Sequence, residues 1–128
     1  LGSSDMFLSI LSPSGELKSS KNIGNKGFDT GTALIERPDG TLILLGHTAP
    51  ETLAAEENFL SNNVFIAHTL PNGNVIKQYK LIGDGLDLGH DITQLKGGKT
   101  IVIGTTESSS GDYPVSQGGK DIFLAIWH

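Results

Sequence analysis

The segment Asp5-Met-Phe-Leu-Ser-Ile-Leu-Ser-Pro-Ser-Gly15 decides the fold, because the chain repeats it. It returns as Asn63-Val-Phe-Ile-Ala-His-Thr-Leu-Pro-Asn-Gly73, and it begins a third time as Asp121-Ile-Phe-Leu-Ala-Ile-Trp-His128, at a constant offset of 58 residues. Self-similarity at such a period is the signature of repeat architectures, in which each repeat is one supersecondary unit. The sequence therefore predicts tandem copies of one small unit.

The same offset holds through the rest of the unit without a gap. The positions that recur are mostly glycines and apolar strand centres, with one aspartate among them. They include Phe7, Phe65 and Phe123, Gly31 and Gly89, Asp29 and Asp87, and Gly46 and Gly104. Glycines and strand centres serve the backbone and the core, so we expect these recurring residues to be structural.

Each unit divides into four short runs, which we name strands A to D. In the complete unit three of them are predicted at 31–37, 41–46 and 74–82, and strand C is the segment that starts at Asn63 and is closed by Pro71-Asn-Gly73. Pro38-Asp-Gly40 is a tight-turn signal between the first two strands. Strand B is apolar on consecutive residues, which indicates burial on both faces, whereas the lysines of strand D are typical of a solvated edge. A four-stranded sheet with both faces buried needs a similar sheet on each side.

Radial stacking of such sheets is a β-propeller, so the predicted fold is all-β, with four-stranded antiparallel blades. The whole chain is one repeat region, with a partial blade at 1–27, a full blade at 28–85 and a partial blade at 86–128. This gives the strand order C-D, A-B-C-D, A-B-C in a partial array of about two blades. A β-sandwich is the alternative, although its strands should alternate in polarity. A parallel β-helix is less compatible, because its rungs are shorter than 58 residues.

Four motifs in this repeat resemble a known family. They are Asp-Ile-Phe-Leu-Ala at 121–125, Pro-x-Gly at 71–73, Gly-x-Asp-x-Gly at 85–89, and Gly-Gly-Lys-Thr-Ile-Val-Ile-Gly-Thr-Thr at 97–106. Together they resemble the bacterial β-propeller repeat called SBBP. The resemblance implies a propeller fold and an exported bacterial protein, whether periplasmic, cell-surface or secreted. It implies no activity, because the motifs are structural.

Nine strands are too few to close a ring, since propellers have at least four blades of four strands. We therefore expect an apolar face to remain open at each end of the array. Either the chain is a segment flanked by further blades, or several copies complete one another. In both cases the isolated chain is expected to associate.

Composition and motifs exclude several kinds of partner and chemistry. The net charge is −5, and the nine Lys and Arg residues are scattered, which argues against nucleic acid. No apolar run approaches the ~20 residues that span a bilayer. The chain has no cysteine, its four histidines form no metal or triad motif, and it has no phosphate-binding fingerprint. We therefore predict a non-catalytic module without a cofactor.

The long B–C and D–A connections are the predicted place for a partner, which would be a protein or a glycan. The alternative function is a glycan-binding or glycan-processing propeller domain, with Tyr113 next to the sugar. The B–C loops are expected at 47–62 and 105–120, and 50–60 has a short helical pattern that suits a lid or a docking element. The candidate ligand-binding residues are Asp84, Asp87, Glu107, Asp112, Tyr113 and Gln117. Calcium at Asp84, Asp87 and Asp91 is a weaker hypothesis, because the spacing does not match a calcium loop and the recurrence of Asp87 suits a structural role.

Overall fold

The computed structural model describes residues 4–49 and 61–127, and this part of the chain is all-β. Nine strands, joined by antiparallel pairing, form three sheets within it, and no helix occurs among these residues. The strands are β1 (Met6–Leu11), β2 (Leu17–Ile23), β3 (Phe28–Glu36), β4 (Leu42–Ala49), β5 (Asn63–Thr69), β6 (Val75–Leu81), β7 (Asp87–Gln94), β8 (Thr100–Thr106) and β9 (Asp121–Trp127).

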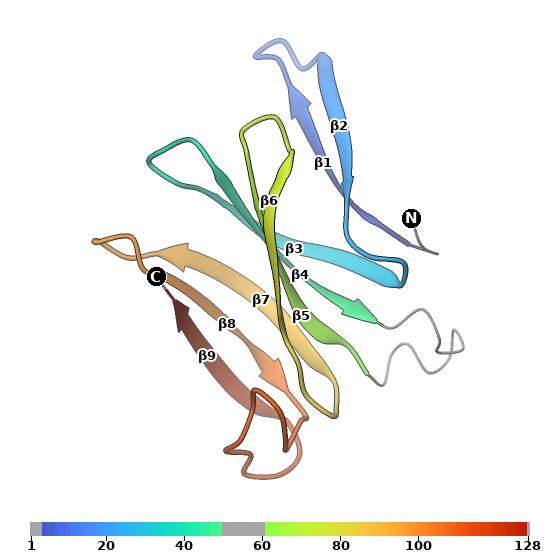
Figure 1. Ribbon diagram of the computed structural model, residues 1–128, viewed down its shortest axis with the longest axis vertical. Coiled ribbons are helices and arrows are strands. Elements are labelled where there is room, and N and C mark those ends of the chain that lie inside the picture. Colours follow the sequence, from blue (N-terminus) through green and yellow to red (C-terminus); the bar gives the residue numbers. More distant parts are fainter. Residues whose placement is uncertain (1–3, 50–60, 128) are drawn as a thin grey trace.

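The sheets follow one another in chain order, from blue to red in Figure 1. The first sheet contains β1 and β2, the central sheet β3 to β6, and the third sheet β7 to β9, each with its strands in sequence order. The predicted all-β class and the grouping of strands into two, four and three are confirmed. The helix predicted at 50–60 lies outside the described residues. Within the described ranges, nothing forms a helix that could span a membrane.

Four tight hairpins share one geometry, at residues 13–15, 38–40, 71–73 and 96–98. In the second hairpin Arg37 N–H donates to the Thr41 carbonyl and Gly40 N–H to the Arg37 carbonyl, and the other three repeat this pair of bonds. The last loop residue is a glycine with φ of 86°, 81°, 83° and 87° in turn, in the left-handed region that a three-residue hairpin requires. We call this edge of the sheets the tight-turn rim. The opposite edge, with the connections 24–27, 82–86 and 107–120, is the long-loop rim.

Two bulges account for several of the recurring glycines. The pairing of β3 with β4 shifts between Gly31 and Ala33, and β7 with β8 shifts at the equivalent place, between Gly89 and Asp91. A Cβ atom at Gly46 would overlap the Thr30 carbonyl oxygen, so only glycine fits beside the bulge. Strand A therefore begins earlier than the predicted position 31, because Gly31 is part of a bulge within β3 and does not end the preceding turn.

Two apolar clusters hold the sheets together. One contains Met6, Ile23, Leu44, Phe65 and Ala67 and joins the first sheet to the central sheet. The other joins the central sheet to the third and contains Ile43, Leu45, Val64, Ile66, Ile92 and Val102. β4 and β5 are thus buried on both faces, whereas β2 and β6 are largely exposed edge strands that carry lysines, as predicted.

Candidate functional site

Asp87 is the centre of the long-loop rim, and its carboxylate is occupied by the rim itself. Its side chain has no exposed surface. It accepts hydrogen bonds from the hydroxyls of Thr106 (2.5 Å) and Ser108 (2.9 Å), and the Ser108 hydroxyl in turn accepts the Gly85 N–H (2.8 Å). Burial raises the pKa of Asp87, while the two hydroxyls oppose this rise by stabilising the carboxylate. The network joins the 82–86 and 107–120 connections and leaves no free oxygen for a ligand.

Two other candidate aspartates accept hydrogen bonds from the backbone of the long-loop rim. Asp84 accepts the Ser109 N–H at 2.7 Å, and this bond holds the pKa of its carboxyl below the usual value. Asp112 accepts the Ile82 N–H at 2.7 Å. Each bond ties one long connection to the other, so both carboxylates serve the loop structure.

Tyr113 is buried, which argues against its predicted role as a platform for a sugar. Only 7% of the residue is exposed, and its ring packs edge-on against Phe123 with centroids 5.2 Å apart. Its hydroxyl has no partner among the described residues, and burial raises its pKa. A sugar needs an exposed ring face, and this ring offers none.

The remaining candidates also have local partners. Glu107 forms an exposed ion pair with Lys120 at 3.2 Å, and Gln117 donates its backbone N–H to Asp121 at 2.8 Å. Asp29, the repeat equivalent of Asp87, is buried and accepts the Asn25 N–H at 2.6 Å. Over 4–49 and 61–127, no group of three or more His, Asp or Glu residues lies close enough to hold a metal ion, which argues against the calcium hypothesis at Asp84, Asp87 and Asp91.

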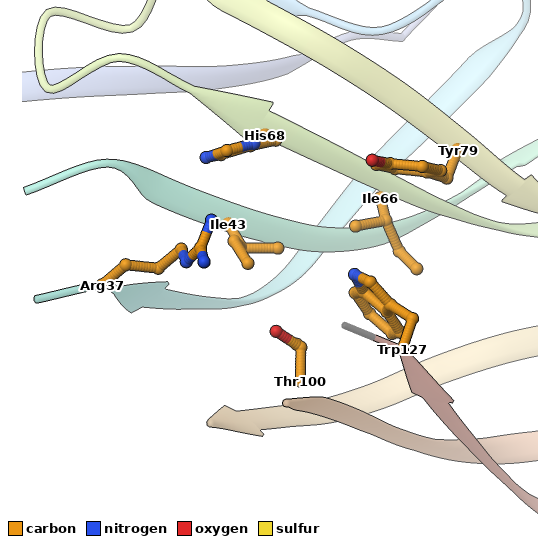
Figure 2. A pocket seen from close by; sticks show the side chains of 7 residues that line it. All are labelled: Arg37, Ile43, Ile66, His68, Tyr79, Thr100 and Trp127. Carbon is orange, nitrogen blue, oxygen red and sulfur yellow. The ribbon is translucent and has the colours of Figure 1, made fainter. Parts of the chain in front are cut away.

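A different feature lies at the opposite edge, between the central and third sheets. It is a cavity of about 50 Å³ near the tight-turn rim. Figure 2 shows the side chains around it, which come from β4, β5, β6, β8, β9 and the residue that follows β3. They are Arg37, Ile43, Ile66, His68, Tyr79, Thr100 and Trp127. We call this space the inter-sheet cavity.

Hydrogen-bond donors dominate the polar lining of the inter-sheet cavity. The Nε atom of Arg37 is buried and has no partner in the described chain. The Thr100 hydroxyl and the Trp127 indole nitrogen turn toward the space beside it in Figure 2. Arginine and tryptophan side chains can only donate, whereas the hydroxyls of Thr100 and Tyr79 and the imidazole of His68 can also accept.

His68 is fixed by the neighbouring hairpin. The hydroxyl of Thr41 donates its single proton to Asp39 (2.6 Å), so it can only accept from Nε2 of His68 at 2.9 Å. We therefore assign the proton to Nε2 of His68. The bond from Thr41 is also the main reason that the pKa of Asp39 is lowered, and the charge of Arg37 contributes to the same shift.

None of the polar lining residues stands out as a motif in the sequence, but all five differ from their repeat equivalents. Position 37 is Leu95 in the next unit, and position 100 is Leu42 in the unit before. His68 is equivalent to Ile10 and Ile126, Tyr79 to Lys21, and Trp127 to Leu11 and Thr69. The predicted partner site lies in the long loops, whereas these differences between the repeat copies occur in and beside the strands.

No protein-family model matches the chain, and no curated protein matches it.

Proposed function

We propose that the chain is a non-catalytic propeller segment that acts as a scaffold, and that each end sheet packs against another sheet of the same repeat. One observation carries this proposal. The apolar residues exposed on the end sheets are the repeat equivalents of residues that are buried in the central sheet. The proposal concerns the sheet faces, because the long-loop rim uses its polar groups internally.

At the first sheet the open face contains Phe7. Phe7 is 65% exposed, whereas its equivalent Phe65 is 1% exposed and packs in the cluster between the first and central sheets. We therefore expect another sheet to cover Phe7, in the same way that the first sheet covers Phe65. The covering face of the first sheet, with Met6 and Ile23 at its centre, is apolar.

At the third sheet the opposite face is open. Ile122 and Leu124 are 73% and 61% exposed, whereas their equivalents Val64 and Ile66 are 0% and 2% exposed. Both equivalents belong to the cluster that joins the central and third sheets. Burying an aliphatic side chain of this size contributes roughly 1.5–3 kcal/mol, so several of them provide a substantial driving force for a further sheet.

The occupant of each open face is a further unit of this repeat, either from flanking sequence or from a second copy. The SBBP resemblance supports the additional proposal that the host protein is exported and bacterial. For the isolated chain the expectation is association through these faces. Sedimentation velocity from about 1 to 50 µM, roughly the range in which moderate protein interfaces assemble, measures it directly.

Leu124→Lys places a charge on the open face and is expected to shift the chain toward monomer. Ile76→Lys is the matched control, because Ile76 is 50% exposed on the edge strand β6, and its repeat equivalent is already Lys18. A wild-type chain that stays monomeric at every concentration, or a control that dissociates the assembly as well as Leu124→Lys does, would overturn the proposal.

A further inference from the structure

We propose that the inter-sheet cavity is a binding site for a carboxylate, with Arg37 as its principal ligand-binding residue. This site is independent of the proposed scaffold role, because it lies between two sheets of one chain and at the opposite edge from the long loops. Four observations support the assignment: a buried unpaired donor, donor geometry, size, and the singular character of the residues involved.

The first observation is a buried, unpaired donor on a charged side chain. Arg37 forms no ion pair with any residue in 4–49 or 61–127, and its Nε–H is buried without an acceptor. A buried charged donor without a partner is costly, and water supplies an acceptor but no opposite charge. The carboxylate of Asp39, on the same hairpin, accepts the N–H and the hydroxyl of Thr41 on one oxygen, and its negative charge acts on Arg37 without forming a hydrogen bond or an ion pair with it. An anion from outside would supply the acceptor that Nε lacks.

The second observation is the kind of anion that the lining suits. The guanidinium of Arg37 is a planar fork, which matches the two oxygens of a carboxylate. The Thr100 hydroxyl and the Trp127 indole N–H lie across the space from it (Figure 2). Ile43 and Ile66 form apolar walls, which strengthen each polar contact by excluding water.

The third observation is size. The cavity volume is about 50 Å³, above the ~10–15 Å³ that one water needs on the same measure, so the space can hold a small anionic group such as a carboxylate.

The fourth observation is that the site uses residues found nowhere else in the chain. Arg37 is the one arginine and Trp127 the one tryptophan in 128 residues. The recurring residues build the sheets, and the equivalents of these two elsewhere are leucine or threonine.

Because Trp127 is unique, its fluorescence reports on the cavity without a label. We would titrate the full chain with sodium acetate at pH 7.5 and constant ionic strength, with sodium chloride as the reference anion. The expected result is a saturable change in Trp127 emission and a rise in the midpoint of thermal unfolding that acetate produces and chloride does not. A second titration uses a blocked Gly-Glu-Gly peptide, with Gly-Gln-Gly as its control. Tighter binding of the glutamate peptide would assign the site to an acidic side chain of a partner, and tighter binding of acetate to a free small carboxylate.

Arg37→Leu introduces the residue found at the equivalent repeat position, Leu95, so the fold should be retained. The acetate affinity of this variant should fall at least ~10-fold. Thr100→Val keeps the side-chain shape and should weaken binding as well, which keeps the test open if the first variant unfolds. Lys99→Gln removes an equal charge from the exposed neighbouring position and should leave the affinity unchanged. Equal responses to acetate and chloride, or undiminished acetate binding by Arg37→Leu, would show a cavity that holds water only.

Discussion

Phe65 and Phe7 provide an internally matched test of the packing, because one repeat position is buried in one unit and exposed in another. Phe65 is 1% exposed within an apolar cluster, and Phe65→Ala removes a full aromatic side chain and leaves a cavity. Such substitutions cost about 3–5 kcal/mol of unfolding free energy. Phe7 is 65% exposed, so roughly a third of its side chain is removed from water. Phe7→Ala should therefore cost about 1 kcal/mol or less, since it removes a fraction of the ~1.5–3 kcal/mol of full burial and opens no cavity.

Urea denaturation followed by circular dichroism measures both values, at a protein concentration where sedimentation shows one species. Phe65→Leu, which should cost no more than about 1.5 kcal/mol, is the milder variant if Phe65→Ala does not fold. Equal losses at the two positions would refute the packing of the central sheet between its neighbours. If Phe7 packs against a second copy, the cost of Phe7→Ala should instead increase with protein concentration.

Three further predictions follow from the fold. Gly46→Ala should lower the unfolding free energy by about 1–3 kcal/mol or more, because the new methyl group overlaps the opposing carbonyl, and an unchanged urea midpoint would contradict the bulge geometry. Ser108→Ala should lower the unfolding free energy by about 1–3 kcal/mol, since it breaks the buried network around Asp87. Ser109→Ala, at the next position, removes only an exposed contact and should change the urea midpoint little. Equal effects of the two substitutions would show that the network is unimportant for stability. Burial, and next the charge of His90, lower the pKa of His47 below 6.5, so the unfolded chain binds a proton that the folded chain does not. Stability should therefore fall as the pH drops below about 6.5, and His47→Thr should flatten this part of the pH profile of thermal unfolding.

Much of the fold could be predicted because the repeat fixes relative positions along the chain. The glycines at 31 and 46 recur with the bulge that they accommodate, and Pro71-Asn-Gly73 marks a hairpin that the structure contains. Strand limits were less predictable. A bulge keeps a strand paired through a glycine that looks like a turn in sequence, so β3 begins at Phe28 and not at 31.

The candidate site was harder to predict, because hydrogen bonding across loops has no sequence signature. Asp87 and Tyr113 have the residue types of a ligand site. In the structure, however, Asp87 accepts hydrogen bonds from hydroxyl groups of the long-loop rim, and Tyr113 packs on Phe123. The inter-sheet cavity exists only after two sheets pack together. Arg37 and Trp127 are 90 positions apart, and nothing in their local sequence indicates that they face the same space.

The free edge of β9 has a consequence for handling the protein. Over the described residues β9 pairs with β8 alone, whereas its equivalent β5 is covered by β6 with its exposed lysines. The strand Asp121–Trp127 has one charge, no proline and mostly β-forming side chains, the composition of segments that stack into cross-β fibrils. An unpaired edge of this kind is a template for growth by strand addition. A charged residue or a partner strand at this edge should keep the chain dispersed over storage, and thioflavin fluorescence with time would show whether it does.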